Sequence, residues 1–227
     1  MFRNLILTLS LPFFLLCKDK EVPLPFGIEM RMMSVDTAGQ GKNDTNGYYL
    51  PEKDSYRVVY IEIDKNGDKS SDEFLWQGLA PFQKPEEKGV NNMVKVHEEV
   101  DENYDGKIDL IRWLLPNELI ALVQKDSDND GYFETTRYYN LKKRVVRREI
   151  DRGKGFPTIF IFFDRAEIDT NGDKVVDTVV FGSSDLELEE KAVNLREAKP
   201  LKAEASFVLN PKLLPVEERP ILGSGIF

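Results

Sequence analysis

A nine-residue acidic pattern occurs four times along this 227-residue chain. Each copy has Asp at position 1, Asn or Asp at position 3, Asp at position 5, and Asp or Glu at position 9. The copies consist of Asp64, Asn66, Asp68 and Asp72; Asp101, Asn103, Asp105 and Asp109; Asp126, Asp128, Asp130 and Glu134; and Asp169, Asn171, Asp173 and Asp177. A random order of the same residues gives far fewer than one such match, so the chain contains a structural repeat.

The similarity between the copies continues on both sides of the acidic positions. A Glu or Gln stands two residues before position 1. Ten residues after position 1 stands Phe, Ile, Thr or Val, and twelve residues after it stands an aromatic residue. These downstream pairs are Phe74 and Trp76, Ile111 and Trp113, Thr136 and Tyr138, and Val179 and Phe181. Residues two apart point to the same face of a strand. We therefore expect a strand to leave each loop with a bulky, inward-facing residue at its middle.

Two further copies are incomplete. Asp151 opens a fifth copy in which Ile161 and Phe163 occupy the two bulky positions. Its ligand positions lack side-chain oxygens, because they hold Gly153, Gly155 and Ile159. A weaker sixth copy starts at Asp36 and has Asp44 at position 9. The fifth copy is interpreted as a repeat that keeps the scaffold and has lost the ion.

The spacing of the copies predicts the fold class. Two steps of 25 residues, from 101 to 126 and from 126 to 151, fit one hairpin per repeat. We expect a mainly β antiparallel meander, either an open curved sheet or a partial propeller-like or barrel-like sheet. The loops at 64, 101, 126 and 151 should then line one rim. The shorter last step leaves open whether residues 158–168 form one long strand, which would place the Asp169 loop at the opposite rim.

The N-terminal segment predicts export. Residues 1–16 form an apolar run that is shorter than the roughly 20 residues of a membrane-spanning helix and is typical of a signal peptide. Cys17, the only cysteine, ends this run and is followed by the polar residues 18–20. This arrangement resembles a bacterial lipoprotein signal, in the loose form found in spirochaetes. Leu16 departs from the pattern, which usually has a small residue before the cysteine.

The lipoprotein resemblance implies that Cys17 carries lipid and anchors an exported protein in the bacterial envelope, at the outer membrane or cell surface. An uncleaved anchor, or a plain signal with a chance cysteine, is the alternative. The expected organisation is a signal peptide over 1–16, a tether over 17–26, a repeated β domain over 27–184, and a C-terminal helix with an extended arm over 185–227. A capping box at Ser184 to Glu187 predicts that this helix runs to about Ala198.

The acidic loops predict calcium binding. Calcium prefers six to eight oxygen ligands, and carboxylates at alternate loop positions crowd together unless a cation neutralises them. The pattern, followed by a strand, resembles the calcium loops of FG-GAP (integrin propeller-like) repeats, with the segment 101–110 as the closest match. This resemblance implies about four Ca²⁺ sites. Lys69 and Lys174 occupy the family's glycine position, and Gly67 and Gly172 stand two residues earlier, so these two loops are expected to bend differently and bind more weakly.

Composition limits the partners. The chain carries 31 Lys and Arg against 40 Asp and Glu, a net charge of −9, which argues against nucleic acid. His97 is the only histidine and has no cysteine nearby in the sequence, which argues against a zinc site. We expect a non-enzymatic, calcium-binding envelope lipoprotein with a structural or adhesive role and a protein or polysaccharide ligand. The alternative is a hydrolase of envelope or extracellular polymers on a calcium-stiffened β-scaffold.

Overall fold

The structure is a computed structural model that describes residues 21–23, 29–51, 56–79 and 93–222. The signal peptide expected over residues 1–16 and the lipidation site expected at Cys17 lie outside the described residues. Within the described part of the chain, no helix is long and apolar enough to span a bilayer.

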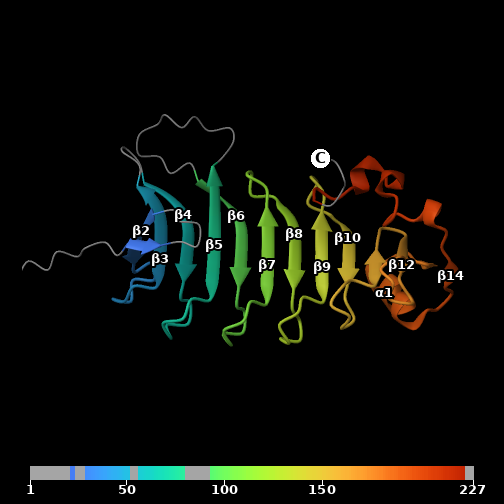
Figure 1. Ribbon diagram of the computed structural model, residues 1–227, viewed down its shortest axis with the longest axis horizontal. Coiled ribbons are helices and arrows are strands. Elements are labelled where there is room, and N and C mark those ends of the chain that lie inside the picture. Colours follow the sequence, from blue (N-terminus) through green and yellow to red (C-terminus); the bar gives the residue numbers. More distant parts are fainter. Residues whose placement is uncertain (1–20, 24–28, 52–55, 80–92, 223–227) are drawn as a thin grey trace, which may run out of the picture.

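Fourteen strands form one antiparallel sheet in which every strand pairs with the next strand in sequence (Figure 1). The strands are β1 Glu21–Pro23, β2 Glu29–Val35, β3 Thr45–Pro51, β4 Tyr56–Ile63, β5 Glu73–Leu79, β6 Met93–Val100, β7 Leu110–Leu114, β8 Ile120–Lys125, β9 Thr135–Tyr139, β10 Val145–Ile150, β11 Ile159–Ile161, β12 Arg165–Ile168, β13 Thr178–Phe181 and β14 Lys199–Pro200. Because β1 and β14 lie at the two edges, the sheet is open. The predicted meander of repeated hairpins is confirmed, in its open form.

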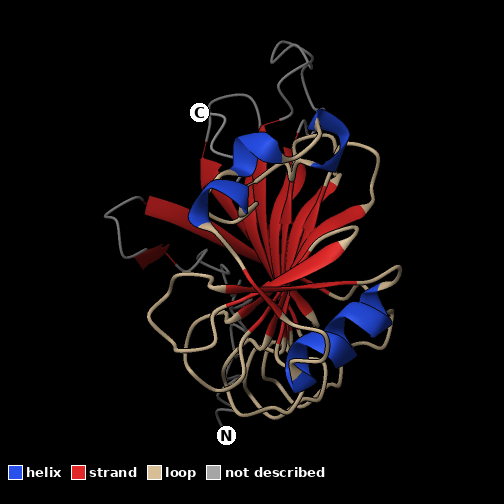
Figure 2. Cartoon of the chain, turned by 90° about the vertical axis from the view of Figure 1, so that its right-hand side faces the viewer, coloured by secondary structure: helices blue, strands red, loops and turns tan. Residues whose placement is uncertain are grey.

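The sheet is strongly twisted. The strand pairs β3–β4, β5–β6, β7–β8 and β9–β10 each contain a register shift, as at a β-bulge. A bulge adds one residue to one strand and increases the local right-handed twist. Seen along the sheet, the strands consequently fan out around a common axis (Figure 2).

The C-terminal residues cover both faces of the last strands. Helix α1, Asp185–Asn194, packs Leu188 and Ala192 against the face formed by Ile161 and Val180. On the other face, Phe207 packs against Phe162. The segment that carries Phe207 also contains the short 3₁₀ helices η1 Ala203–Ala205, η2 Pro211–Leu213 and η3 Val216–Glu218. The most deeply buried apolar core of the described chain therefore lies at the C-terminal end of the sheet.

Helix α1 begins where the sequence predicts and ends earlier. The Ser184 hydroxyl accepts a hydrogen bond from the Glu187 backbone N–H at 3.3 Å, which caps the first turn. Leu195 adopts a left-handed conformation with φ 51°, and its N–H donates back to the last turn of the helix. A left-handed residue stops helix propagation, so the expected extension to Ala198 does not form.

The Asp169 loop lies on the same rim as the other acidic loops. Residues 158–168 do not form one long strand, because β11 and β12 are short and are joined by a tight turn. The Phe162 N–H donates to the Arg165 carbonyl at 2.8 Å across this turn. Two strands of three and four residues fit into the 18-residue step from position 151 to position 169, and they bring the Asp169 loop back to the rim of the other acidic loops.

The loop of the fifth copy is one residue shorter than the nine-residue pattern of the other copies. The Thr158 N–H donates to the Ile150 carbonyl at 3.0 Å, as the Asp109 N–H donates to the Val100 carbonyl at 2.9 Å. Thr158, not Ile159, is therefore the structural counterpart of position 9. The shift also moves Phe163 out of the strand, and its side chain is 47% exposed.

The expectation of an inward-facing bulky residue after each loop is wrong for two copies. Trp113 is 45% exposed and Phe181 is 43% exposed. Trp113 stands on a part of the sheet where the described residues provide no second layer, so a strand there has no inner face. Phe181 is the last residue of β13, at the rim away from the acidic loops. Alternation along a strand predicts which residues share a face, and it does not predict that the face is covered.

Candidate metal centre

Six loops follow one another along a single rim of the sheet (Figure 1). They comprise residues 36–44, 64–72, 101–109, 126–134, 151–158 and 169–177. Neighbouring loops are linked through their backbones: the Asp101 N–H donates to the Asp72 carbonyl, and the Asp126 N–H donates to the Asp109 carbonyl, both at 2.8 Å. The acidic repeats at Asp64, Asp101 and Asp126 therefore stand side by side on this rim, and the 151–158 loop separates them from the repeat at Asp169.

The carboxylate at position 1 holds the loop around it. Asp101 accepts hydrogen bonds from the N–H groups of Tyr104 at 2.6 Å and Gly106 at 2.7 Å. Asp126 accepts the equivalent bonds from Asn129 at 2.7 Å and Gly131 at 2.8 Å. The same two bonds recur at Asp64 and Asp169. Position 1 thus anchors the backbone at positions 4 and 6 in all four loops.

The carboxylate at position 9 closes the loop from the other side. Asp109 accepts from the Glu102 N–H at 2.7 Å, and Glu134 accepts from the Ser127 N–H at 2.7 Å. Asp72 and Asp177 make the corresponding bonds. Most of the carboxylates at positions 1 and 9, which together form the frame of each loop, are buried. Asp72, Asp101 and Asp109, for example, are only 2%, 4% and 2% exposed. Hydrogen bonds from backbone N–H groups stabilise their charge.

All four loops bend in the same way, contrary to the expectation for those with lysine at position 6. Positions 4 and 6 are left-handed in every loop, and each loop has one glycine at these two positions. The φ angles are 80° at Gly67 and 80° at Lys69, 63° at Tyr104 and 87° at Gly106, 62° at Asn129 and 94° at Gly131, and 78° at Gly172 and 71° at Lys174. The glycine therefore moves between two equivalent left-handed sites, and the bend does not change.

The loop frame does not need acids at positions 3 and 5. In the weak sixth copy, Asp36 accepts from the N–H groups of Gln40 and Gly41, and Asp44 accepts from Thr37 and Ala38. This loop forms with Ala38 at position 3 and Gln40 at position 5. The exposed acidic residues at positions 3 and 5 elsewhere are consequently not explained by the turn itself.

Positions 3 and 5 pair with each other in three of the loops. Each has Asn at position 3, whose amide donates to the Asp at position 5: Asn66 to Asp68 at 3.0 Å, Asn103 to Asp105 at 3.3 Å, and Asn171 to Asp173 at 3.1 Å. The remaining acidic loop, at Asp126, has Asp128 and Asp130 at these positions and lacks such an amide. It therefore concentrates more negative charge than its neighbours.

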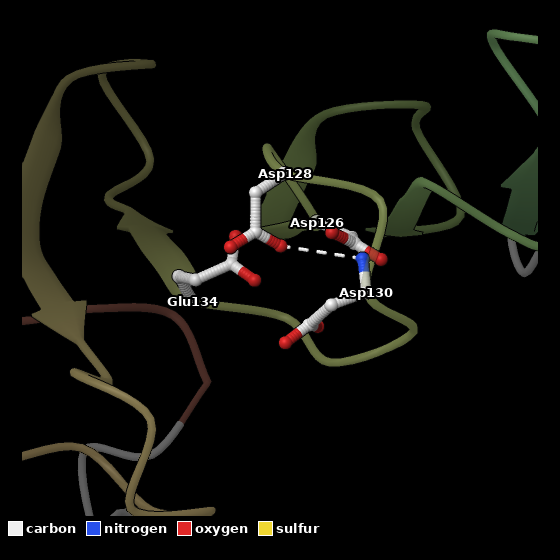
Figure 3. A group of neighbouring side chains, drawn as sticks. All are labelled: Asp126, Asp128, Asp130 and Glu134. Atoms are coloured by element: carbon white, nitrogen blue, oxygen red, sulfur yellow. Dashed lines mark hydrogen bonds between the residues drawn. The ribbon is translucent and has the colours of Figure 1, made fainter.

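In the Asp126 loop, the four predicted ligands Asp126, Asp128, Asp130 and Glu134 converge (Figure 3). One carboxylate oxygen from each lies within 4.8 Å of the others. Oxygens bound to one Ca²⁺ at about 2.3–2.6 Å lie within about 5 Å of each other, so the spacing fits this ion. Glu134 Oε1 is buried and has no hydrogen-bond partner among the described residues. A cation would provide the interaction that this oxygen lacks.

The other three loops do not bring three carboxylates together as closely. Among the described residues, the Asp126 loop is the one place where at least three Asp, Glu, His or Cys side chains converge in this way. The loops at Asp64, Asp101 and Asp169 have the same backbone frame, with their position 3 and 5 side chains directed to each other. Their ligand residues are in the predicted order along the loop but are not gathered about a common centre.

Local hydrogen bonds keep two of the predicted ligands ionised. The Ser70 N–H and the Asn66 amide lower the pKa of Asp68. Partial burial pushes the pKa of Asp177 upward, but hydrogen bonds from Thr178 and Thr170 outweigh burial, and the pKa is lowered overall. Both carboxylates are therefore charged at neutral pH, as cation ligands must be.

Sequence reasoning missed a second feature of the molecule, which is a row of aromatic rings across β3–β7. Trp76 and Trp113 were expected in a core, and His97 was considered only as a zinc ligand. The structure places the three rings next to each other on one face of the sheet. The cross-strand register aligns them, and pairing the strands by their repeats could have shown this alignment.

Comparison with known proteins does not assign this chain to a family. No protein family and no curated protein matches the chain. Two solved structures resemble it weakly. One is accessory secretory protein 1, 2 and 3 of Streptococcus pneumoniae, with 14% identity, a TM-score of 0.32, and coverage of 64% of this chain and 23% of that chain. The other is TarM, with 12% identity, a TM-score of 0.30, and coverage of 52% and 19%. The chain thus spans less than a quarter of the length of either.

Proposed function

We propose that this protein is a calcium-binding envelope lipoprotein whose ions stabilise the rim of a single extended β-sheet. Its role is structural or adhesive and not enzymatic. The observation that carries the proposal is the Asp126 loop, in which four carboxylates converge and the buried Glu134 Oε1 lacks a hydrogen-bond donor.

The repetition of the loop supports more than one ion. The backbone frame is the same in the loops at Asp64, Asp101, Asp126 and Asp169. Ion binding in the other three loops would require the side chains at the exposed positions 3 and 5 to exchange their mutual hydrogen bond for contacts with the ion. Loops linked by backbone hydrogen bonds would transmit the ordering of one site to the next. We therefore expect about four calcium ions, of which the Asp126 site is the tightest.

The position of the sites supports a structural role for calcium. The candidate ligands stand at the rim, in the connections between strands, where an ion bound only by the ordered loop stabilises the folded state by mass action. Extracellular modules of this kind bind calcium with dissociation constants of about 10⁻⁴–10⁻³ M. Export and lipid anchoring through Cys17 would place the protein where calcium reaches such concentrations.

Calorimetric titration tests this proposal. Residues 18–227 are stripped with chelator and titrated with Ca²⁺, and thermal unfolding is followed in parallel. We expect about four sites and a marked rise in melting temperature. Asp130→Asn should remove the tightest site, and Asp105→Asn should remove a weaker one. Glu118→Gln, an exposed position at the opposite rim, is the control with the same change in charge and should bind like the wild type.

Two results would count against the proposal. A melting temperature that is the same in excess chelator and in excess calcium would exclude a stabilising role. Equal affinity of the wild type and Asp130→Asn would show that any bound calcium lies elsewhere.

A further inference from the structure

One face of the sheet carries a continuous row of five rings, which we call the aromatic strip. It is formed by Tyr48, Tyr60, Trp76, His97 and Trp113, one from each of the strands β3–β7, and each ring is paired in register with the next. Successive ring centroids are 5.3, 4.9, 4.8 and 4.1 Å apart. The strip is partly open to solvent, most of all at Trp113, which is 45% exposed.

Two carboxylates flank the aromatic strip. Glu62 and Glu99 each stand two residues from a ring of the strip and share its face of the sheet. Glu62 accepts a hydrogen bond from the Tyr48 hydroxyl at 2.9 Å, and Glu99 contacts His97 Nε2 at 2.9 Å. Neither carboxylate forms an ion pair with a lysine or arginine of the described chain. The face therefore combines a row of tilted, contacting rings with two carboxylates.

Farther along the same face, the chain places one of its own cations against rings and a carboxylate. Arg147 is in register with Tyr138 and takes a place in the row itself. Its guanidinium lies 5.2 Å from the centroid of the Tyr138 ring and 5.4 Å from that of Phe160. It also forms an ion pair with Glu149, the counterpart of Glu62 and Glu99 in the repeat. Here the chain supplies its own cation to rings and a carboxylate.

The last copy of this glutamate is also compensated from within the chain. Glu167 is fully buried and accepts hydrogen bonds from the Ser206 hydroxyl at 2.6 Å and the Phe207 N–H at 2.7 Å. The third copy has the neutral Gln124. Among the glutamates of the five copies, Glu62 and Glu99 are thus the two that pair with no lysine or arginine of the described chain and are covered by no segment of it, although Glu99 contacts His97.

A hollow beside the aromatic strip gives a ligand access to these groups. It has a volume of about 370 Å³, and Tyr60, Trp76 and Glu99 are among the residues that line it. The faces of Trp and Tyr attract a guanidinium or ammonium group, by about 0.5–1 kcal/mol at exposed sites and more when water is excluded. A carboxylate on the same face adds a charge-assisted hydrogen bond.

We propose that the aromatic strip, with Glu62 and Glu99, binds a basic segment of a partner protein. Arginine or lysine side chains of that segment lie over the rings and pair with the two carboxylates, as Arg147 does within the chain. The net charge of −9 attracts such a partner over a longer range. The rings of the strip stand on the strands, and the hollow beside them also borders two acidic loops, at Ser70 and at Asp101. The proposal goes beyond calcium binding and does not depend on a bound ion.

The chain contains its own reporter for this surface. Trp76 and Trp113 are its only two tryptophans, and both belong to the aromatic strip. Residues 18–227 are titrated with hexa-arginine, and tryptophan fluorescence is recorded, with a hexa-citrulline peptide as the neutral probe of similar shape. We expect a saturable change with hexa-arginine and at least a tenfold weaker response with hexa-citrulline.

Paired variants separate the aromatic strip from general attraction to an acidic protein. The double variant Glu62→Gln with Glu99→Gln keeps a hydrogen-bond acceptor for Tyr48 and removes two charges, and it should weaken binding about tenfold or more. Glu118→Gln with Glu204→Gln removes two exposed charges elsewhere and should leave the affinity unchanged. Thermal unfolding of all variants identifies any that fail to fold. The affinity of Trp113→Phe for hexa-arginine, measured by calorimetry, then provides a second test of the strip and should be lower than that of the wild type.

Three outcomes would overturn the proposal. Equal binding of hexa-citrulline would show that charge is not recognised. Equal weakening in the two double variants would show attraction to net charge alone. A response to neutral oligosaccharides, with none to hexa-arginine, would assign the strip to a different class of ligand. Running the titrations in calcium and in chelator, with bound calcium measured by metal analysis, keeps the result separate from that of the loops.

Discussion

Strands β11–β13 are covered on both faces by the C-terminal residues, whereas the aromatic strip on β3–β7 is partly open to solvent. At the covered end, Ala166, Val180 and Leu188 are fully buried. On β3–β7, Tyr60 and Trp76 are only half-buried and contact the rings of neighbouring strands. The same repeat therefore serves two environments, with a layered core at one end and a row of cross-strand contacts at the other.

This difference indicates which part of the molecule depends most on its loops. Burial of apolar area contributes about 25 cal/mol per Å², and it stabilises the covered end without help from the rim. Cross-strand pairs contribute only about 0.2–1 kcal/mol each. The open end of the sheet, β3–β7, therefore gains more stability from any ion that orders the loops between its strands. We expect the two ends to respond differently to core mutation, to pH and to calcium.

The largest effect should come from the core beneath helix α1. Leu188→Ala removes a fully buried side chain from the contact with Val180 and should lower the free energy of unfolding by about 2–5 kcal/mol. Leu186→Ala, in the same helix and 78% exposed, should change it by less than about 0.5 kcal/mol. Denaturant unfolding of both variants measures the difference. Similar losses would mean that α1 does not stabilise this end.

The next effect concerns the segment that covers the other face. Glu167→Gln replaces a buried carboxylate that accepts from Ser206 and from the backbone of Phe207 and Val208. An amide cannot accept all three bonds, and an unsatisfied buried donor costs about 1–3 kcal/mol. Hydrogen exchange at Phe207 should accelerate, with little change in the acidic loops. Unchanged protection at Phe207 would show that another contact holds this segment.

A smaller effect, at the open end, should depend on pH. Burial pushes the pKa of Glu98 upward, but hydrogen bonds from Lys95 and Arg112 outweigh burial and lower it from 4.5 to about 2. Because the folded-state pKa is depressed, this stabilisation is complete above pH 4.5 and is lost as the pH falls through about 2. Glu98→Gln should be less stable than the wild type by about 1–2 kcal/mol at neutral pH. The gap should close between pH 4.5 and about 2. A gap that is independent of pH would contradict the assignment.

The smallest effect tests the shared bend of the loops. Lys69 has φ 80°, a conformation that favours glycine, and Lys69→Gly should raise the free energy of unfolding by about 0.5–1 kcal/mol. Gly67→Ala should lower it by about 1 kcal/mol, although no atom lies within 4 Å of the added methyl group, because φ at Gly67 is also 80°. Thermal unfolding of the two variants measures both changes. Changes of the same sign would disprove the two left-handed positions.

The repeat made much of this fold predictable. Identical spacing of Asp101 and Asp126 requires identical connections, and a hairpin of 25 residues leads to a meander with its loops on one rim. The position of the Asp169 loop was not predictable, because spacing alone does not show that strands as short as β11 and β12 can pair. The one-residue deletion before Thr158 was hidden, since glycine fits either alignment.

The sequence also indicated the candidate ligands, but not how they lie. Acid at positions 1 and 9 is used by the loop backbone. The hydrogen bonds of Asp36 and Asp44 show this role most clearly, because their loop lacks the acids at positions 3 and 5. The converging loop differs from the other three at two of the four ligand positions, with Asp128 in place of Asn at position 3 and Glu134 in place of Asp at position 9. The covering role of Phe207 depends on contacts between distant residues, which a local pattern does not contain.

Hydrogen exchange with and without calcium tests the central claim most directly. The N–H groups of Asn129 and Gly131 donate to Asp126 and report on the loop, and that of Phe207 reports on the covered end. Excess Ca²⁺ should slow exchange at Asn129 and Gly131 by at least tenfold relative to chelator and leave Phe207 nearly unchanged. Equal exchange of the loop amides in calcium and in chelator would contradict the account.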